Sequence, residues 1–190
     1  PLSTITANVS LSQVIDPESI VRVVYELTRQ QGYLSSPYRY VRIAANADDL
    51  RSTCLYPVQM CIREDNPDSR LRHAIAINGR RALGRSLSAG LKYRFYIDDW
   101  KMSSHTLGVD GAWAPDSAWL LGLSYRYYNQ GKAEHYQPFY LSMAVPRYPT
   151  SDKELSTLST HRLELELSRG FELDDVGCAL RAVLRAAPSY

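Results

Sequence analysis

Residues 86–97 read SLSAGLKYRFYI, and this stretch decides the fold. Its odd-numbered positions are apolar or aromatic, whereas its even-numbered positions are mostly small or polar and include Lys92 and Arg94. Successive side chains of a β-strand point to opposite faces, so this period of two predicts a strand with one apolar face and one polar face. Residues 118–128 repeat the pattern, and we expect the two segments to form a hairpin.

The same alternation recurs along the chain and predicts an all-β, antiparallel, up-and-down protein of about eight strands. The expected strands are 4–12, 20–30, 71–81, 86–97, 102–114, 118–128, 161–168 and 176–186. Tight turns near 16–19, 84–85, 114–117 and 172–175 alternate with longer connections, of which about 35–70 and 129–155 are the long loops. Short turns at one end of the strands and long loops at the other are typical of a transmembrane β-barrel of the bacterial outer membrane.

Composition limits the function classes. With 22 Lys and Arg against 20 Asp and Glu, the net charge of +2 does not predict a nucleic-acid partner. No apolar run approaches the roughly 20 residues of a membrane-spanning helix. The 14 Tyr suit positions that are apolar on one side and wet at the tip. We therefore expect the lipid bilayer as partner, with other membrane or periplasmic proteins as a second class, and no cofactor.

Charge on the face opposite the apolar positions is the feature that favours a membrane barrel, because such a barrel turns its apolar face to lipid and keeps a polar interior. The residues expected to face the lumen are Arg22, Glu26, Arg72, Arg80, Lys92, Arg94, Asp110, Arg126, Arg162, Glu164, Glu166, Arg181 and Arg185. The aromatic residues expected at the membrane interfaces are Tyr25, Tyr93, Phe95, Trp113, Trp119, Tyr125 and Tyr127.

The lumen charges have two interpretations, which the sequence leaves open. In a narrow barrel, Arg22, Lys92, Arg94 and Arg126 pair with carboxylates such as Glu26 and plug the interior. In a wide barrel they line water and favour anions. Pore width depends on the number of strands. With eight strands and tight turns on the periplasmic side, both chain ends lie on the long-loop side, so we expect this chain to be part of a larger barrel. The first segment, near Ile5, and the last, near Leu180, are then expected to be edge strands when this chain is considered alone.

The leading hypothesis is an outer-membrane β-barrel without an assigned role, for which a passive channel and a membrane assembly scaffold are the two roles considered. Two other functions stay open. The first is a soluble β-barrel that binds a small apolar ligand, since such barrels share the alternation. The second is an outer-membrane hydrolase whose rim residues are Asp98, Asp99 and His105. The sequence contains none of the common hydrolase, zinc or nucleotide motifs, and the four His have no metal-ligand spacing, so we assign no catalytic residue and no metal site.

The cysteines divide into a close pair and a single residue. Cys54 and Cys61 lie in the first long loop, and Cys178 lies in a predicted strand. In an oxidising compartment the close pair is expected to form a disulfide, although sequence spacing alone leaves two free thiols as the alternative.

Three motifs resemble a known family. They are QGYLSSPYR at 31–39, YRFYIDDW at 93–100 and SHTL at 104–107. Together they resemble the later part of an uncharacterised family of bacterial outer-membrane proteins, known only as domain-of-unknown-function family 3570. The resemblance covers most of residues 2–128 and implies a barrel fold with further strands before this region. It implies no activity.

Overall fold

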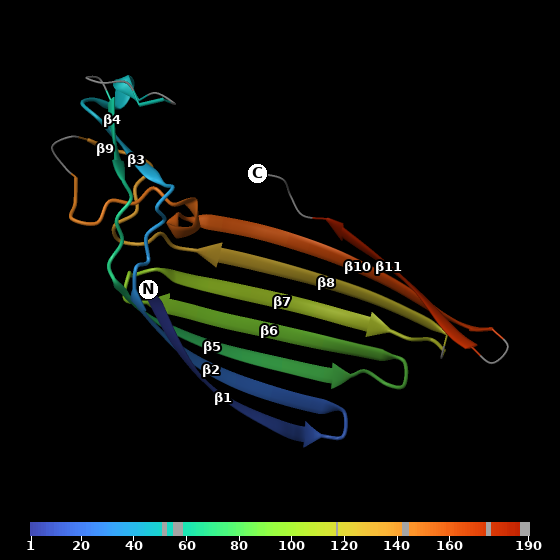
Figure 1. The fold of residues 1–190 in the computed structure, drawn as a ribbon. Coiled ribbons are helices and arrows are strands. Elements are labelled where there is room, and N and C mark those ends of the chain that lie inside the picture. Colours follow the sequence, from blue (N-terminus) through green and yellow to red (C-terminus); the bar gives the residue numbers. More distant parts are fainter. Residues whose placement is uncertain (51–52, 55–58, 117, 142–144, 174–175, 187–190) are drawn as a thin grey trace.

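The protein is built around one eight-stranded antiparallel sheet (Figure 1). The computed structural model describes the backbone of residues 1–190 except 51–52, 55–58, 117, 142–144, 174–175 and 187–190, and the side chains only up to Gly170. The strands of the sheet, in spatial order, are β1 (Leu2–Asp16), β2 (Ser19–Gly32), β5 (Ser69–Ala82), β6 (Leu87–Asp98), β7 (Ser103–Trp113), β8 (Trp119–Gln130), β10 (Leu158–Leu173) and β11 (Val176–Ala186).

The register keeps even-numbered residues together on one face from β2 to β10. Arg22 lies opposite Asn78, Lys92 opposite Gly108, and Arg126 opposite Arg162. Because side chains alternate along each strand, every odd-numbered residue of these strands points to the other face. The alternation in the sequence therefore becomes a sheet with one polar face and one apolar face.

The predicted hairpin of residues 86–97 and 118–128 is wrong. Strand β7 lies between β6 and β8 and pairs with both. A short turn at residues 98–102 returns the chain antiparallel to β6, so β7 occupies the neighbouring position before β8 begins. Several strands are also longer than predicted, since β1 extends over Leu2–Asp16 and β10 over Leu158–Leu173.

The two long loops, predicted to be irregular, contain secondary structure of their own. They form a second, three-stranded sheet in the order β4-β3-β9. Its strands and the two short 3₁₀ helices of these loops are β3 (Tyr40–Ala44), η1 (Ala47–Asp49), β4 (Gln59–Arg63), β9 (Tyr140–Leu141) and η2 (Lys153–Leu155). We call this region, residues 33–68 and 131–157, the head; it lies at the loop end of the large sheet (Figure 1).

Most of the buried apolar side chains belong to the loop end and not to the large sheet. One cluster contains Trp100, Met102, Ala133 and Leu155, and a second contains Val41, Ile43 and Tyr140. Of the buried hydrophobic residues in the described part of the chain, Ala74 alone lies in the large sheet. Up to Gly170, where the side chains are described, the large sheet is therefore held by its hydrogen-bonded ladder and by contacts on its polar face, without a hydrophobic core of its own.

The large sheet is open. Strand β1 pairs only with β2 and strand β11 only with β10, within the backbone that the structure describes. The prediction that the first and last segments are edge strands is confirmed, and the sheet of this chain is not closed into a barrel. No helix in the described ranges is long and apolar enough to cross a membrane.

Candidate functional site

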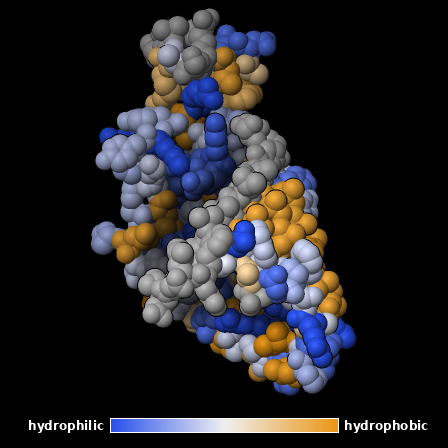
Figure 2. Space-filling model, turned by 90° about the vertical axis from the view of Figure 1, so that its right-hand side faces the viewer, coloured by the Kyte–Doolittle hydropathy of each residue, from blue (hydrophilic) through white to orange (hydrophobic). Residues whose placement is uncertain are grey.

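The odd-numbered face of the large sheet is an exposed apolar surface. Leu91, Leu123 and Leu163 are 56%, 54% and 49% exposed. Figure 2 shows hydrophobic side chains in broad patches along the flank of the molecule, beside a hollow where hydrophilic side chains gather. An apolar surface that extends over a whole sheet is far larger than the patches that monomeric soluble proteins usually leave uncovered, so it indicates an interaction surface.

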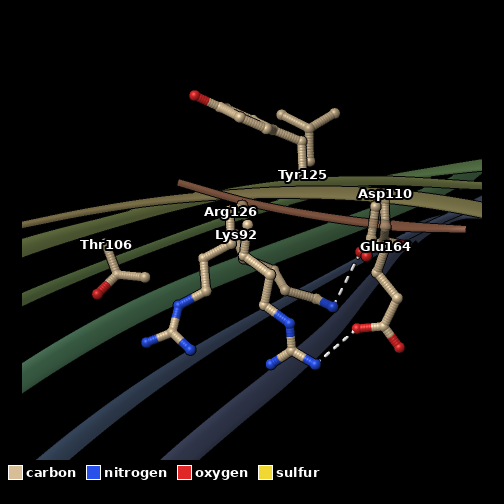
Figure 3. A pocket seen from close by; sticks show the side chains of 10 residues that line it. Lys92, Thr106, Asp110, Tyr125, Arg126 and Glu164 are labelled. Atoms are coloured by element: carbon tan, nitrogen blue, oxygen red, sulfur yellow. Dashed lines mark hydrogen bonds and ion pairs between the residues drawn. The ribbon is translucent and has the colours of Figure 1, made fainter. Parts of the chain in front are cut away.

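The even-numbered face carries paired charges. Figure 3 shows Lys92, Asp110 and Glu164 on one side of the strands and Tyr125 on the other. Lys92 Nζ lies 2.9 Å from Asp110 Oδ1, and Arg162 Nη2 lies 2.8 Å from Glu164 Oε2. Each ion pair of this kind, between partly exposed side chains, contributes little to the stability of the fold. It does hold the two charged groups at defined positions.

Two ion pairs on this face reach across an intervening strand. Arg80 of β5 pairs with Asp110 of β7 over β6, and Arg94 of β6 lies 3.5 Å from Glu26 of β2 over β5. Side chains two strands apart converge when the sheet curves toward their side. Figure 3 agrees, because the first strands pass on the side to which the charged residues point. We call this surface the concave face.

Glycines make room for the charged groups on the concave face. A Cβ at Gly90 would stand 2.9 Å from both carboxylate oxygens of Asp110, and one at Gly122 would stand 3.3 Å from Cβ of Glu166. Neither glycine has a positive φ, so what these positions require is space rather than an unusual backbone conformation. The Asp110 carboxylate therefore lies over the backbone of β6 at Gly90, where it pairs with Arg80 and Lys92.

Three hollows lie along the described part of the concave face, and two of them are predominantly basic; the other, of about 190 Å³ near the tight turns, is lined by Arg80 together with Asp110, Glu164 and Glu166. The first basic hollow, of about 250 Å³, lies between β6, β7, β8 and β10 and contains Lys92, Arg126 and Arg162 together with Asp110 and Glu164 (Figure 3). The second, of about 610 Å³, lies toward the head and is lined by Arg70, Arg72, Arg94, Arg126, Glu26 and Glu154 among others. Basic side chains outnumber carboxylates in these two linings, whereas carboxylates prevail in the hollow near the tight turns.

Arg72 and Arg126 line the second hollow without a direct ion pair to a described carboxylate. The Nε atom of Arg72 is buried and has no hydrogen-bond partner among the described residues. Arg70, by contrast, forms an ion pair with Asp98 through Nε and Nη2. The hollow therefore presents two cationic groups to whatever occupies it.

Asp98 is a structural carboxylate. It accepts hydrogen bonds from Arg70 Nε at 2.9 Å, from the Tyr96 hydroxyl at 2.7 Å, and from the backbone amides of Trp100 and Met102 at 3.1 and 3.0 Å. Its side chain is completely buried. Its acceptor capacity is used in holding the turn between β6 and β7 against β5, which leaves none for a reacting group.

The three residues considered for a rim hydrolase do not form a site. Asp98 and His105 lie on opposite faces of the sheet, since Asp98 points to the concave face and His105 pairs with Tyr93 on the apolar face. Asp99 is exposed in the turn. In the described part of the chain, no group of three or more His, Cys, Asp or Glu residues is arranged to hold a metal ion.

A family model described as "Protein of unknown function (DUF3570)" matches residues 2–181. The chain belongs to this family. No curated protein and no solved structure gives a significant match. Membership in DUF3570 thus extends over nearly the whole chain, well past the three motifs that resemble the family, and it supplies no activity.

In this DUF3570 chain, the other residues predicted for the lumen are placed as follows. Arg22, Glu26 and Glu166 occupy even-numbered positions of β2 and β10 and share the concave face with the charged residues above. Arg181 lies in β11 opposite Ser168, and Arg185 opposite Glu164; their side chains, like that of Cys178, are outside the described residues. A disulfide joins Cys54 to Cys61 in the head, with their Cα atoms 5.8 Å apart.

The aromatic residues predicted for the interfaces all lie on the odd-numbered, apolar face. The structure brings three of them, Tyr25, Tyr93 and Tyr125, into hydrogen bonds with histidines. From the sequence, the histidines are considered as metal ligands, and His105 also as a rim residue of a hydrolase, but their pairing with tyrosines is not predicted. The signal was present, because each histidine stands at an odd-numbered, apolar-face position of a strand next to the one that holds its tyrosine.

The fourth histidine, His135, belongs to the head. Its Nε2 lies 3.1 Å from Asn66 Oδ1, and its ring meets the indole of Trp100 edge-on with centroids 5.0 Å apart. Burial is the main cause that lowers the pKa of His135 below its ordinary value of 6.5, and the charge of Arg70 lowers it further, against the opposing effect of the Glu134, Asp98 and Glu64 carboxylates. His135 is therefore a neutral packing residue near neutral pH.

Proposed function

We propose that this chain forms part of the wall of an outer-membrane β-barrel, with its apolar face against lipid and its concave face around a water-filled lumen that attracts anions. The observation that carries the proposal is the absence of a hydrophobic core on the large sheet in the described part of the chain: the apolar face is exposed from β1 to β10 as far as Gly170, while the opposite face is charged. A soluble sheet covers its apolar face with its own chain. A barrel in lipid has no need to.

Strand length supports the same arrangement. The strands of the large sheet have 11 to 16 residues. About 9–11 tilted residues are enough to cross the hydrocarbon of a bilayer. The large sheet is therefore tall enough to span, with the head outside the hydrocarbon at one end.

The edges of the sheet must be paired if it lies in lipid. Unsatisfied backbone groups in hydrocarbon cost several kcal/mol each, so open edges do not persist there. Strands β1 and β11 present such edges. We infer that additional strands complete the barrel, which makes the lumen wider than eight strands would allow.

The lumen is expected to favour anions because its cations exceed its carboxylates. Arg72 and Arg126 line the larger hollow without a direct ion pair to a described carboxylate, and Arg94 is only loosely paired with Glu26 at 3.5 Å. Rings of Arg and Lys select anions in known pores. The plugged alternative, in which all charges cancel, is less well supported because these two arginines lack carboxylate partners among the described side chains.

A soluble barrel with an apolar ligand has no support in this geometry. Such a protein needs an apolar interior, whereas the concave face carries Arg, Lys, Asp and Glu. The disulfide between Cys54 and Cys61 agrees with an oxidising compartment outside the cytoplasm, in which structural disulfides persist.

The experiment is a measurement of ion selectivity. The full-length protein that contains this chain is purified in detergent, inserted in a planar bilayer and studied under a KCl gradient. The reversal potential is expected to show anion preference, and the double variant R72Q/R126Q is expected to lose most of it. The matched control is K101Q, which removes a cation from an exposed pair with Glu134 in the turn and head, away from the hollow.

Four results would contradict the proposal. Cation preference, or an anion preference unchanged in R72Q/R126Q, would remove the role of the two arginines. An inserted protein without conductance would establish the plugged barrel instead. A protein that stays monodisperse without detergent and does not insert would overturn the membrane assignment itself.

A further inference from the structure

Three tyrosine–histidine pairs repeat on the apolar face. They join β2 to β5, β6 to β7, and β8 to β10. In each, the tyrosine hydroxyl lies within 2.8 Å of a histidine Nδ1 on the neighbouring strand: Tyr25 with His73, Tyr93 with His105, and Tyr125 with His161. The tyrosines are equally exposed, at 42%, 39% and 40%. A threefold repeat of one polar contact on an otherwise apolar surface indicates a common environment for the three pairs.

The geometry of the pairs is the same each time. The histidine does not lie directly opposite its tyrosine but opposite the residue two positions further along the tyrosine's strand, which is Leu27, Phe95 or Tyr127. The contact is therefore diagonal, at the distance that long aromatic side chains reach across a ladder. Ring centroids of the pairs are 6.1 to 6.2 Å apart.

The pairs advance along the sheet by a constant step. Followed straight across the register, His73 leads to Ser103 on β7, but His105 lies two residues nearer the tight turns. Followed in the same way, His105 leads to Ser159 on β10, and His161 again lies two residues nearer the turns. The three histidines thus shift by one residue for each strand, always in the same direction.

A shift of one residue per strand has a simple geometric meaning. A residue advances about 3.3 Å along a strand, and neighbouring strands are about 4.8 Å apart, so the line through the three pairs is perpendicular to the barrel axis when the strands tilt by about 35°. Transmembrane barrels have a strand tilt of about 35–45°. The three pairs then lie at one height, in a plane parallel to a membrane surface.

A second aromatic level lies toward the tight turns. Trp113 is eight residues beyond His105 on β7, and Trp119 is eight residues from Tyr127 on β8. At about 3.3 Å per residue and a tilt of about 35°, the two levels are roughly 22 Å apart, close to the apolar band of about 25 Å between the aromatic girdles of membrane barrels. Between the levels the odd-numbered positions of β7 are Leu107, Val109 and Gly111.

Each of the three imidazoles has one ring nitrogen without a hydrogen-bond partner among the described residues. Nδ1 is used by the tyrosine, so this nitrogen is Nε2 in all three pairs. In the neutral tautomer in which the tyrosine donates to Nδ1, the hydrogen is on Nε2, which is then a donor. A donor of this kind on a lipid-facing surface is costly in hydrocarbon and is satisfied at the level of lipid headgroups.

We propose that these three pairs form a belt that fixes the loop-side boundary of the bilayer, in which each histidine Nε2–H donates to a phosphate or ester oxygen of a lipid. The inference rests on the proposed membrane orientation and adds to it the level at which the hydrocarbon ends and the residues that contact the lipid headgroups. The tyrosine acts as a positioning residue, since its hydroxyl holds the imidazole ring and selects the tautomer.

The experiment uses the full-length protein with isotope-labelled histidine and leucine in phosphatidylglycerol–phosphatidylcholine nanodiscs. Cross-relaxation is measured from the imidazole protons of the three belt histidines, and from the Leu123 methyl groups, to the lipid protons. We expect the imidazoles to contact glycerol and headgroup protons several-fold more strongly than the acyl terminal methyls, and Leu123 to show the reverse. In Y93F, the ¹⁵N shifts of His105 alone should report a changed tautomer population.

The outcomes separate the belt from the membrane assignment. Imidazoles that contact only the acyl interior or only water, while Leu123 contacts acyl chains, would overturn the belt and leave the barrel intact. Contacts from the imidazoles to a second, unlabelled copy of the protein would replace lipid by a protein interface. If neither the imidazoles nor Leu123 contact lipid, both proposals fail.

Discussion

The Asp110 carboxylate lies directly above Gly90, and a Cβ on that glycine would stand 2.9 Å from each of its two oxygens. Arg80 and Lys92 both pair with the same carboxylate. One position without a side chain on β6 thus allows a carboxylate of β7 to meet cations from β5 and β6. The charge arrangement of the concave face depends on this close approach.

Replacing Gly90 by alanine should push the Asp110 carboxylate away from its two cations. We expect a loss of about 1–2 kcal/mol in the free energy of unfolding, from the displaced ion pairs and local overpacking. The measurement is urea unfolding in detergent, followed by Trp fluorescence. Gly79 on β5 is the matched control, since nothing lies within 4 Å of a Cβ there. Equal stability of G90A and G79A would show that the contact is not structural.

Breaking the buried pair between Arg70 and Asp98 should cost much more. The side chains are 11% and 0% exposed, and D98A would leave the Arg70 guanidinium buried without its partner. We expect a loss of about 3–5 kcal/mol, because an uncompensated buried charge remains. The control is E134Q, which breaks an exposed pair with Lys101 and should cost less than about 1 kcal/mol. Thermal unfolding of the two variants compares them, and similar losses would contradict this account of Asp98.

The stability of the head should fall in mild acid because of His135. Its pKa is lowered in the folded protein, so the unfolded chain takes up the proton first as pH falls through the ordinary value of 6.5. The stabilisation is thus complete above that pH and is lost below it. Hydrogen exchange of the head amides between pH 7.5 and 5 measures this loss. H135Q should show a weaker pH dependence, and an unchanged profile would assign the effect to other groups.

Reduction of the disulfide between Cys54 and Cys61 should loosen the head and leave the large sheet intact. The bond closes a short loop, with a sequence separation of 7, for which chain-entropy arguments give about 2 kcal/mol. Limited proteolysis with and without reductant tests this, and C54S/C61S is expected to behave like the reduced protein. New cleavage in the strands of the large sheet, instead of in the head, would contradict the assignment.

The sequence predicts the large sheet well because each strand carries its own signal. Leu91 and Lys92, or Leu165 and Glu166, report opposite faces without any knowledge of their neighbours. The predicted hairpin of residues 86–97 and 118–128 is wrong. These two segments have similar and strong alternation, whereas the alternation of β7, which lies between them, is weaker. The packing of the head on the turn at 98–102 could not be predicted, since one cluster joins residues as distant as Trp100 and Leu155. The polar contacts that place them, such as Gln130 to the backbone of Glu154, have no periodicity.

The candidate site likewise has a part that the sequence predicts and a part that it does not. The charged positions of the concave face follow from alternation, but the pairings do not, because Arg80 finds Asp110 across a strand only after the sheet curves. The tyrosine–histidine pairs depend on a diagonal register between strands. Such a contact is visible in the sequence only once the register is known.

The most direct test of the central claim measures the environment of two adjacent residues, Leu123 and Ser124, on β8. Each is replaced in turn by a spin-labelled cysteine, in a background with Cys178 changed to serine, and the protein is placed in lipid bilayers. Collisions with oxygen report contact with hydrocarbon, and collisions with a water-soluble nickel complex report contact with water. We predict that the label at 123 is accessible to oxygen and shielded from nickel, and that the label at 124 shows the reverse. Equal access of nickel to both labels, or shielding of both from lipid and water, would contradict the barrel-wall account.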